Sequence, residues 1–455
     1  MIESVLLFFS AILLLMAGFP VAFTLGGIAL IFAGLGIITG NFDSGYLNAL
    51  PSRLYGTMTN ETLMAVPLFI FMGITLEKAK IAEDLLETMS ALFGGFRGGL
   101  AISVILVGML LAASTGIVGA TVVTMGLLSL PSMMKRDYAP SLSTGVIAAS
   151  GTLGQIIPPS IVLVLLGDVL SSAYQQAQLN QGIYSPETVS VGDLFVGAII
   201  PGLILVASYL LYVLFKSFLN PGSMPTKKTS ADAPTINIRS FLTILLPPLS
   251  LILAVLGSII LGFATITEAA GVGAAGAVFL AFIKKALDWT SLKSISEDTA
   301  KLTTMVFMIL IGASVFSLVF RGYEGDELVQ SYLTSVPGGT FGIVLVVMLA
   351  MFILGFVLDF IEITFVVVPI VAPIILALGV DPVWLGIMIA INLQTSFLTP
   401  PFGFALFYLR GVAPDSISTK SIYMGALPFV VIQIFVLILL ASFPIIVTWL
   451  PSNLY

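Results

Sequence analysis

The chain reads GTLGQIIPPS at residues 151–160 and NLQTSFLTPPFG at residues 392–403. Each segment contains a proline pair and lies within a long apolar run. Proline lacks the backbone donor and disfavours helix in the residue before it, so each pair should interrupt a helix. In a bilayer, the carbonyl groups that an interruption frees must face protein or a polar cavity. We therefore expect two broken helices at polar positions of the fold.

The two segments belong to a longer internal repeat. Prolines separated by 242 residues form two matching sets, at 131, 140, 158 and 159 and at 373, 382, 400 and 401. With about 5% proline per position, a match of this kind at any offset has a chance on the order of 10⁻³. The repeat divides the chain into a first half, 1–217, a linker, 218–240, and a second half, 241–455.

Composition places the repeat in a membrane. Of 455 residues, 58% are hydrophobic and only 9% are charged, whereas soluble domains carry about 25% charged residues. The chain has no Cys and no His, which excludes disulfides, thiolate chemistry and histidine-based zinc sites. Apolar runs of spanning length predict crossings near 4–17, 20–38, 60–77, 141–171, 193–217, 241–262, 265–283, 301–320, 383–409 and 423–447.

Two further apolar regions, 99–134 and 341–376, each have an interruption near the middle, and we interpret both as re-entrant hairpins. The alternative is a pair of ordinary spans with a tight turn. With hairpins, all but two of the 17 Lys and Arg residues fall in loops on one side, the exceptions being Arg53 and Arg321. The positive-inside rule makes that side cytoplasmic, which predicts periplasmic termini.

Each half then holds five crossings and one hairpin. Because five is odd, the two halves face opposite ways across the membrane. An all-α polytopic protein built from an inverted repeat with broken helices is typical of secondary transporters. Segments 77–93 and 288–299 carry mixed charge among apolar residues, which indicates either amphipathic helices at the cytoplasmic interface or solvated loops.

The breaks and the hairpin tips supply the candidate site. Carbonyl and hydroxyl oxygens at broken helices suit Na⁺, and helix N-termini at a hairpin tip attract an anion. The simpler alternatives are a proline kink and small residues that allow close packing. We expect two or more Na⁺ sites among Ser114, Thr115, Gln155, Ile157, Asp359, Thr395, Ser396 and Thr399. The expected substrate contacts are Ser114, Thr115, Gly116, Thr121, Asp359 and Thr395.

Three acidic residues lie in or beside apolar segments. Asp359 is expected either to coordinate Na⁺ or to cap the returning helix of the second hairpin. Glu268 stands at a helix start, which favours a capping role, and Asp168 is expected to mark the membrane interface. The chain has no Gly-Lys-Ser/Thr motif, so it has no P-loop for ATP. An enzyme would need clustered catalytic side chains, and a channel would be expected as an oligomer of shorter repeats.

Several stretches resemble one known family across nearly the whole chain. They are AVPLFIFMG at 65–73, AASGTLGQIIPPS at 148–160, LFVGAIIPG at 194–202, TITEAA at 265–270, and DPVWLG at 381–386 through LTPPFG at 398–403. The family is the large membrane subunit, or DctM-type permease, of tripartite ATP-independent periplasmic (TRAP) transporters. The first hairpin tip, ASTGIVGAT at 113–121, departs from the commoner SGSSA run and is similar to a branch associated with 2-oxo acids and other monocarboxylates.

The resemblance implies an elevator-type transporter of the ion-transporter superfamily in the bacterial inner membrane. It implies Na⁺-driven import of a small organic anion delivered by a soluble periplasmic substrate-binding protein. It also implies a small four-helix membrane subunit as partner. All 17 basic residues are assigned to loops, which leaves none at mid-membrane. We therefore expect hydroxyls and helix N-termini to hold the substrate carboxylate without a dedicated Arg, and Arg53 and Arg321 to meet the binding protein or lipid headgroups. The alternative is a standalone Na⁺/dicarboxylate symporter with the same paired hairpins.

Overall fold

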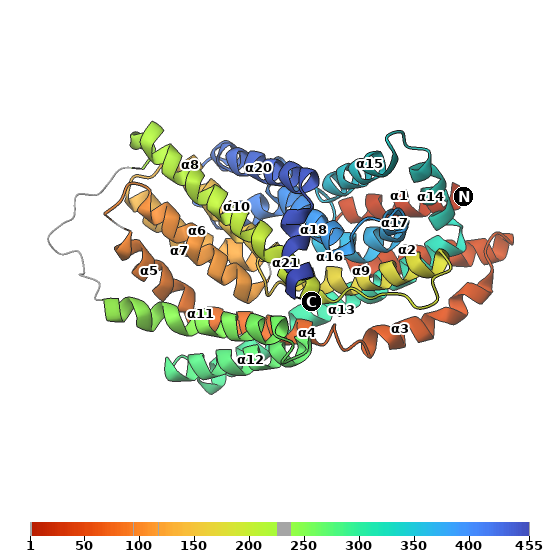
Figure 1. The fold of residues 1–455 in the computed structure, drawn as a ribbon, viewed down its shortest axis with the longest axis horizontal. Coiled ribbons are helices and arrows are strands. Elements are labelled where there is room, and N and C mark those ends of the chain that lie inside the picture. The colour runs from red at the N-terminus through yellow and green to blue at the C-terminus, as the bar shows by residue number, and fades with distance from the viewer. Residues whose placement is uncertain (1, 94, 117, 225–237, 455) are drawn as a thin grey trace. The chain divides into compact units, whose positions relative to one another are not determined.

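The computed structural model describes residues 2–93, 95–116, 118–224 and 238–454, and this part of the chain folds into helices without a strand (Figure 1). The helices of the first half are α1 (Ile2–Met16), α2 (Val21–Thr39), α3 (Leu50–Met58), α4 (Ala65–Lys78), α5 (Ile81–Leu92), α6 (Gly99–Thr115), α7 (Val118–Lys135), α8 (Pro140–Thr152), α9 (Ile161–Asn180) and α10 (Val191–Leu219). Those of the second half are α11 (Ile238–Ile260), α12 (Ile266–Ile283), α13 (Trp289–Gly322), α14 (Gly325–Thr334), α15 (Gly339–Leu354), α16 (Phe360–Glu362), α17 (Val368–Ala377), α18 (Pro382–Leu398), α19 (Phe404–Val412), α20 (Thr419–Ser442) and α21 (Ile445–Leu454).

Among the described residues, 8 helices are long and apolar enough to cross a membrane. Helix is present in each of the ten intervals predicted as crossings, and the two longest are interrupted at the proline pairs as expected. One prediction needs a correction: residues 289–299 form the start of the 34-residue α13 and not a separate interfacial helix. A second correction concerns the basic residues, which the sequence analysis assigns entirely to loops: Arg53, Arg321 and Arg410 lie on helices.

Helix boundaries recur at the spacing of the proline repeat. The returning arms of the two hairpins start at Val118 and Phe360, and the broken helices start at Pro140 and Pro382. Both pairs of positions are 242 residues apart, as are Thr152 and Gln394, which are in contact. The repeat predicted from four prolines is therefore also a repeat of secondary structure.

The chain forms two compact units that each draw on both halves. The first unit comprises Met1–Met64, Val164–Ser190 and Ala300–Gly386, and it contains the second hairpin. The second unit comprises Ala65–Leu163, Val191–Thr299 and Ile387–Tyr455, and it contains the first hairpin and most of both broken helices. The halves predicted from the sequence are thus not the compact bodies of the fold.

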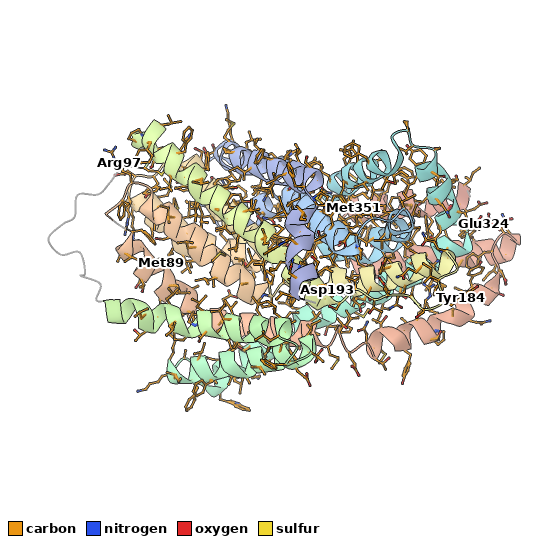
Figure 2. The ribbon with its side chains drawn as sticks, in the orientation of Figure 1. Met89, Arg97, Tyr184, Asp193, Glu324 and Met351 are labelled. Carbon is orange, nitrogen blue, oxygen red and sulfur yellow. The ribbon has the colours of Figure 1, made fainter. Side chains whose placement is uncertain are left out.

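Close helix packing in the second unit depends on glycine. A Cβ on Gly145 of α8 would lie 2.0 Å from the carbonyl oxygen of Gly425 on α20, so these backbones touch. Side chains fill the spaces between the helices within each unit, and Met89 and Met351 are both buried (Figure 2). The loop residue Tyr184 is 89% exposed.

Candidate functional site: two broken helices and a polar cavity

The first break replaces an α-helix with a tight turn. α8 ends at Thr152, a 3-10 turn covers Leu153–Gln155, and a cis peptide joins Pro158 to Pro159 before α9 begins. The hydroxyl of Ser160 donates to the carbonyl oxygens of Gly154 at 2.8 Å and Gln155 at 3.1 Å. These freed carbonyls therefore have a side-chain partner, which a broken helix in an apolar setting requires.

The tip of the first hairpin lies against this break. Gly116 adopts φ +60, and a Cβ there would lie 2.9 Å from Cγ1 of Ile161, the first residue of α9. A Cβ on Gly154 would lie 3.3 Å from the carbonyl oxygen of Ala112 on α6. The structure thus brings together the first tip and the first break, as the sequence analysis predicts. The side chains of Ser114 and Thr115 are outside the described atoms, and Thr121 is buried in α7.

Gln155 is the most unusual side chain at the first break. It is completely buried, and neither its amide nitrogen nor its amide oxygen has a hydrogen-bond partner in the described part of the chain. An unsatisfied buried amide costs about 1–3 kcal/mol, so this residue needs an explanation beyond packing. Ile157 differs: it is partly exposed, and a Cβ on Gly202 would lie 2.7 Å from its Cδ1.

The second break keeps its helix almost to the prolines. α18 continues to Leu398, and a cis peptide joins Pro400 to Pro401 before α19. The Thr395 hydroxyl donates to the carbonyl of Ile391 and the Thr399 hydroxyl to that of Thr395, both at 2.7 Å. Each hydroxyl has used its proton and retains lone pairs as an acceptor, the form in which oxygen binds a cation. Ser396 is fully buried beside them.

A buried polar network joins the two breaks within the second unit. The amide nitrogen of Gln394 donates to the Thr152 hydroxyl at 3.3 Å, and that of Gln433 donates to the Tyr209 hydroxyl at 2.7 Å. Tyr209 also interacts with Gln394 and Thr152. The sequence analysis missed Tyr209 and Gln433, although polar side chains inside the apolar runs of α10 and α20 were the available signal.

Acidic residues take part in two capping boxes, one formed by Asp359 with Glu362 and one by Thr265 with Glu268. Asp359 accepts from the backbone N–H of Phe360 at 2.7 Å, and Glu362 accepts from that of Asp359 at 3.1 Å, at the start of the returning arm in the first unit. The capping alternative for Asp359 is therefore observed, and its role as a Na⁺ ligand stays a prediction. At the start of α12, the N-cap is Thr265, and Glu268 completes the box by accepting from its backbone N–H at 2.8 Å.

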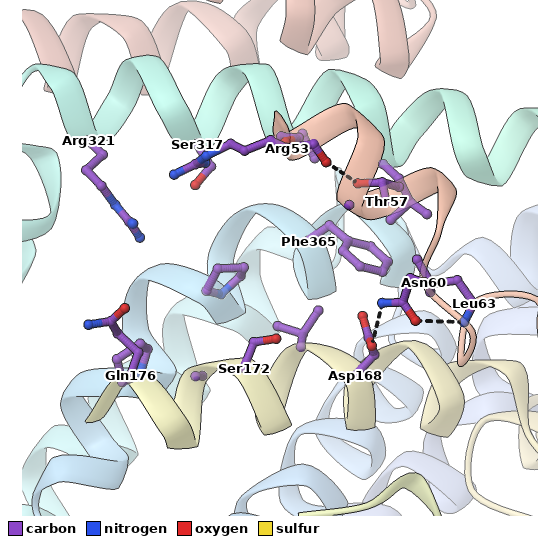
Figure 3. A pocket seen from close by; sticks show the side chains of 18 residues that line it. Arg53, Thr57, Asn60, Leu63, Asp168, Ser172, Gln176, Ser317, Arg321 and Phe365 are labelled. Atoms are coloured by element: carbon purple, nitrogen blue, oxygen red, sulfur yellow. Dashed lines mark hydrogen bonds between the residues drawn. The ribbon is translucent and has the colours of Figure 1, made fainter. Parts of the chain in front are cut away.

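The first unit contains a polar cavity of about 420 Å³ (Figure 3). It lies between α3, α9, α13 and the returning arm of the second hairpin. Its polar lining includes Arg53, Asn60, Asp168, Ser172, Ser317 and Arg321. Asp168, which the sequence analysis expects to mark the membrane interface, accepts a hydrogen bond from the Asn60 amide at 2.9 Å. An acidic residue inside an apolar run was the available signal for this cavity, and the sequence analysis did not use it.

The two arginines of the cavity differ in their partners. Arg321 pairs with Asp326 at 2.7 Å, whereas Arg53 forms no ion pair among the described residues. Burial lowers the pKa of the Arg53 guanidinium, the nearby Arg321 lowers it further, and Asp326 raises it. Because arginine stays protonated under all ordinary conditions, Arg53 is a half-buried positive charge without an ion pair among the described residues.

Comparison with known proteins adds the family context. The family described as tripartite ATP-independent periplasmic transporter, DctM component, matches residues 8–446. The C4-dicarboxylate TRAP transporter large permease protein DctM of Vibrio cholerae is 30% identical over 99% of this chain and 97% of its own length. The sialic acid TRAP transporter large permease protein SiaM of the same organism is 29% identical over 96% of both chains.

Two further comparisons concern length and fold. The isethionate TRAP transporter permease protein DctMQ of Oleidesulfovibrio alaskensis is 28% identical over 95% of this chain but only 64% of its own length. The crystal structure of the YdaH transporter of Alcanivorax borkumensis superimposes with a TM-score of 0.63 over 98% of this chain and 99% of that one. At 14% identity, this last similarity shows the fold alone. Together these findings identify a multi-pass integral membrane protein, and they do not favour a standalone symporter.

Proposed function

Because the chain belongs to the DctM component family of TRAP transporters and is the large permease subunit of such a transporter for organic acids, we propose that it couples import of a small organic anion to a Na⁺ gradient. The proposed ion sites are the two proline breaks, with Gln155 at the first and Thr395, Ser396 and Thr399 at the second. The observation that supports this most is Gln155, whose buried amide oxygen has no hydrogen-bond partner among the described residues and lies beside the freed carbonyls.

The two breaks would offer Na⁺ different oxygen atoms. The first presents backbone carbonyls and one amide, and the second presents hydroxyls that already donate to their own helix. Both sets consist of oxygen donors, as hard cations prefer. We also propose Ser114, Thr115 and Asp359 as ligands from the sequence analysis. Ile157 is proposed to contribute its backbone carbonyl.

The carboxylate of the substrate would sit at the hairpin tips, with Gly116 and Thr121 at the first. Bound Na⁺ supplies positive charge there, because a cation a few ångströms away attracts strongly in a site of low dielectric constant. Na⁺ then raises substrate affinity, and by linkage substrate raises Na⁺ affinity by the same factor. We propose that an elevator movement carries the loaded site across the inner membrane, with both termini periplasmic.

Partners and substrate class follow from the family. We propose that a periplasmic binding protein delivers the anion and that a small membrane subunit assembles with this chain. The isethionate relative is a permease protein named DctMQ, of which this chain covers 64%. Relatives are named for C4-dicarboxylates, sialic acid, isethionate and ectoine. The first hairpin tip favours a 2-oxo acid or another monocarboxylate.

Uptake into proteoliposomes tests this proposal. The chain is reconstituted with its small subunit and binding protein, and labelled pyruvate, lactate and succinate are supplied under imposed gradients. We expect uptake with an inward Na⁺ gradient and no dependence on ATP. Equal uptake driven by a proton gradient in Na⁺-free buffer would contradict Na⁺ coupling. Full uptake without the binding protein would contradict the tripartite arrangement.

A further inference from the structure

We propose that the polar cavity of the first unit is a second anion site, which holds the carboxylate of the transported anion on Arg53 at a step separate from its binding at the hairpin tips. This inference rests on the proposed function for the identity of the anion. The cavity is lined by residues of α3, α9, α13 and the returning arm of the second hairpin. None of these lining residues belongs to the proline breaks at 151–160 and 392–403.

Charge in the cavity is unevenly distributed. Arg53 and Arg321 extend from α3 and α13 at one end, and Asp168 with its partner Asn60 lies at the other (Figure 3). Two guanidinium groups lie near one carboxylate, that of Asp326, which pairs with Arg321 and also acts on Arg53. The basic end therefore carries one excess positive charge, and Arg53 is the arginine without an ion pair among the described residues. A half-buried cation in a concave, polar wall attracts small anions more strongly than an exposed one does.

The polar lining is not a by-product of the internal repeat. A shift of 242 residues maps Ser314 and Arg321 of the cavity onto Met72 and Ala79, which are both buried apolar residues. The same shift maps Asp168 onto Arg410, which donates to backbone carbonyls of residues 413, 414 and 417. The internal repeat therefore does not account for Ser314, Arg321 or Asp168, and the polar lining of the cavity draws on both halves of the chain.

Size and hydrogen-bonding capacity suit a small organic acid. The cavity volume of about 420 Å³ falls in the range of small-molecule pockets, roughly 300–1,000 Å³. Ser172 and Ser317 line it from α9 and α13, and each hydroxyl can donate to or accept from a ligand. A carboxylate on Arg53 would leave the rest of a small acid among these hydroxyls.

Single-cysteine reporters test the charge preference without transport. The chain has no Cys, so Ser317→Cys introduces one thiol in the cavity and Ser335→Cys introduces one on an exposed surface. Purified protein in nanodiscs is treated with an anionic sulfonatoethyl and a cationic trimethylammonioethyl methanethiosulfonate. We expect the anionic-to-cationic rate ratio to be about tenfold higher at position 317 than at position 335, from one nearby charge.

Charge variants identify the residue responsible. Adding Arg53→Gln to Ser317→Cys should bring the ratio to within about twofold of the surface value, while Arg53→Lys should preserve it. Ser172→Cys serves as a second reporter on the opposite wall if Ser317→Cys expresses poorly. The proposal would be overturned if the anionic-to-cationic rate ratio at both cavity reporters equalled that at position 335. It would also be overturned if the higher ratio in the cavity were unchanged by Arg53→Gln.

Protection of the position 317 thiol by added carboxylates distinguishes a carboxylate site from a general anion site. Succinate or lactate should slow labelling at position 317 at least threefold and leave position 335 unchanged. Equal slowing by sodium chloride at matched ionic strength would overturn the assignment to carboxylates. These measurements do not involve a Na⁺ gradient, so their failure leaves the Na⁺-driven uptake experiment as an independent test of the proposed function.

Discussion

The two broken helices occupy equivalent positions of one repeat, yet they expose different chemistry. At the first break, α8 stops at Thr152 and the polar groups are backbone carbonyls and the Gln155 amide. At the second, α18 runs on to Leu398 and the polar groups are hydroxyls of Thr395 and Thr399 bonded to their own helix. The comparison teaches that a repeat preserves where a helix breaks without preserving which atoms become available there.

Gly145→Ala is expected to have the largest effect. It tests whether α8 tolerates a side chain at a position where its repeat equivalent, α18, carries one. Position 145 lies on α8 against Gly425, whereas the equivalent position on α18 is the buried Ile387. A methyl group 2.0 Å from a carbonyl oxygen forces the helices apart, so we expect a loss of about 3 kcal/mol or more. Thermal unfolding in detergent measures it, with Gly411→Ala as control because that site has open space. Equal stability of the two variants would contradict the close approach.

Gln155→Leu should change function and stability in opposite directions. Removing an unpaired buried amide should raise the unfolding temperature, while loss of an ion ligand should lower Na⁺-dependent uptake at least tenfold. Gln178→Leu is the matched control, since Gln178 is buried but bonded to the backbone of Glu187 at both amide ends. That variant should lose stability and retain its Na⁺ dependence. Unchanged uptake by Gln155→Leu would remove this residue from the site.

Tyr209→Phe tests whether the polar network between the two breaks stabilises the fold. Its hydroxyl accepts from Gln433 and interacts with Thr152 and Gln394, so we expect a loss of about 1–2 kcal/mol in unfolding free energy. Tyr212→Phe is a close control, because both tyrosine rings contact Phe429 with centroids 5.1 Å apart. If the two variants unfold alike, the Tyr209 hydroxyl contributes no net stability.

Thr399→Ala is expected to have the smallest effect. It removes one hydroxyl oxygen from the second break and leaves the backbone carbonyls in place, so apparent Na⁺ affinity in uptake should fall about threefold. The control Thr144→Ala removes a hydroxyl that donates to the carbonyl four residues back, that of Pro140, at 2.9 Å, on α8 and away from the Pro158–Pro159 pair. An equal shift in both variants would point to helix stability as the cause.

Much of the fold followed from the sequence because membrane spans are long and apolar. The proline pairs located both breaks, and the hairpins followed from the interruptions at residues 112–116 and 359–362. Three short helices were not predicted, namely α3, α14 and α21, since each has only 9 or 10 residues and no spanning apolar run. Periodicity over so short a segment does not distinguish a helix from a loop.

The candidate site was predicted less completely. The first hairpin tip and the first break do meet, at Gly116 and Ile161, because neighbouring segments of one repeat pack together. The cavity was not predicted, because Arg53, Asp168 and Ser317 come from segments more than 100 residues apart. Only the packing of α3, α9 and α13 gathers them. The interpretation of Arg53 and Arg321 as contacts for a binding protein did not consider a shared cavity.

The π-helical turn Ile363–Val367 in the second hairpin changes the direction in which the side chains after it point around the axis of the returning arm. Each residue of an α-helix advances by about 100°, and a π turn accommodates about one residue more than an α turn. The returning arms of the two hairpins have the same 18-residue length, but the arm of the first is α-helical from Val118 to Lys135. Two arms of equal length therefore direct different faces to their neighbours. In the second arm, Pro369 and Pro373 follow the π turn and line the polar cavity of the first unit.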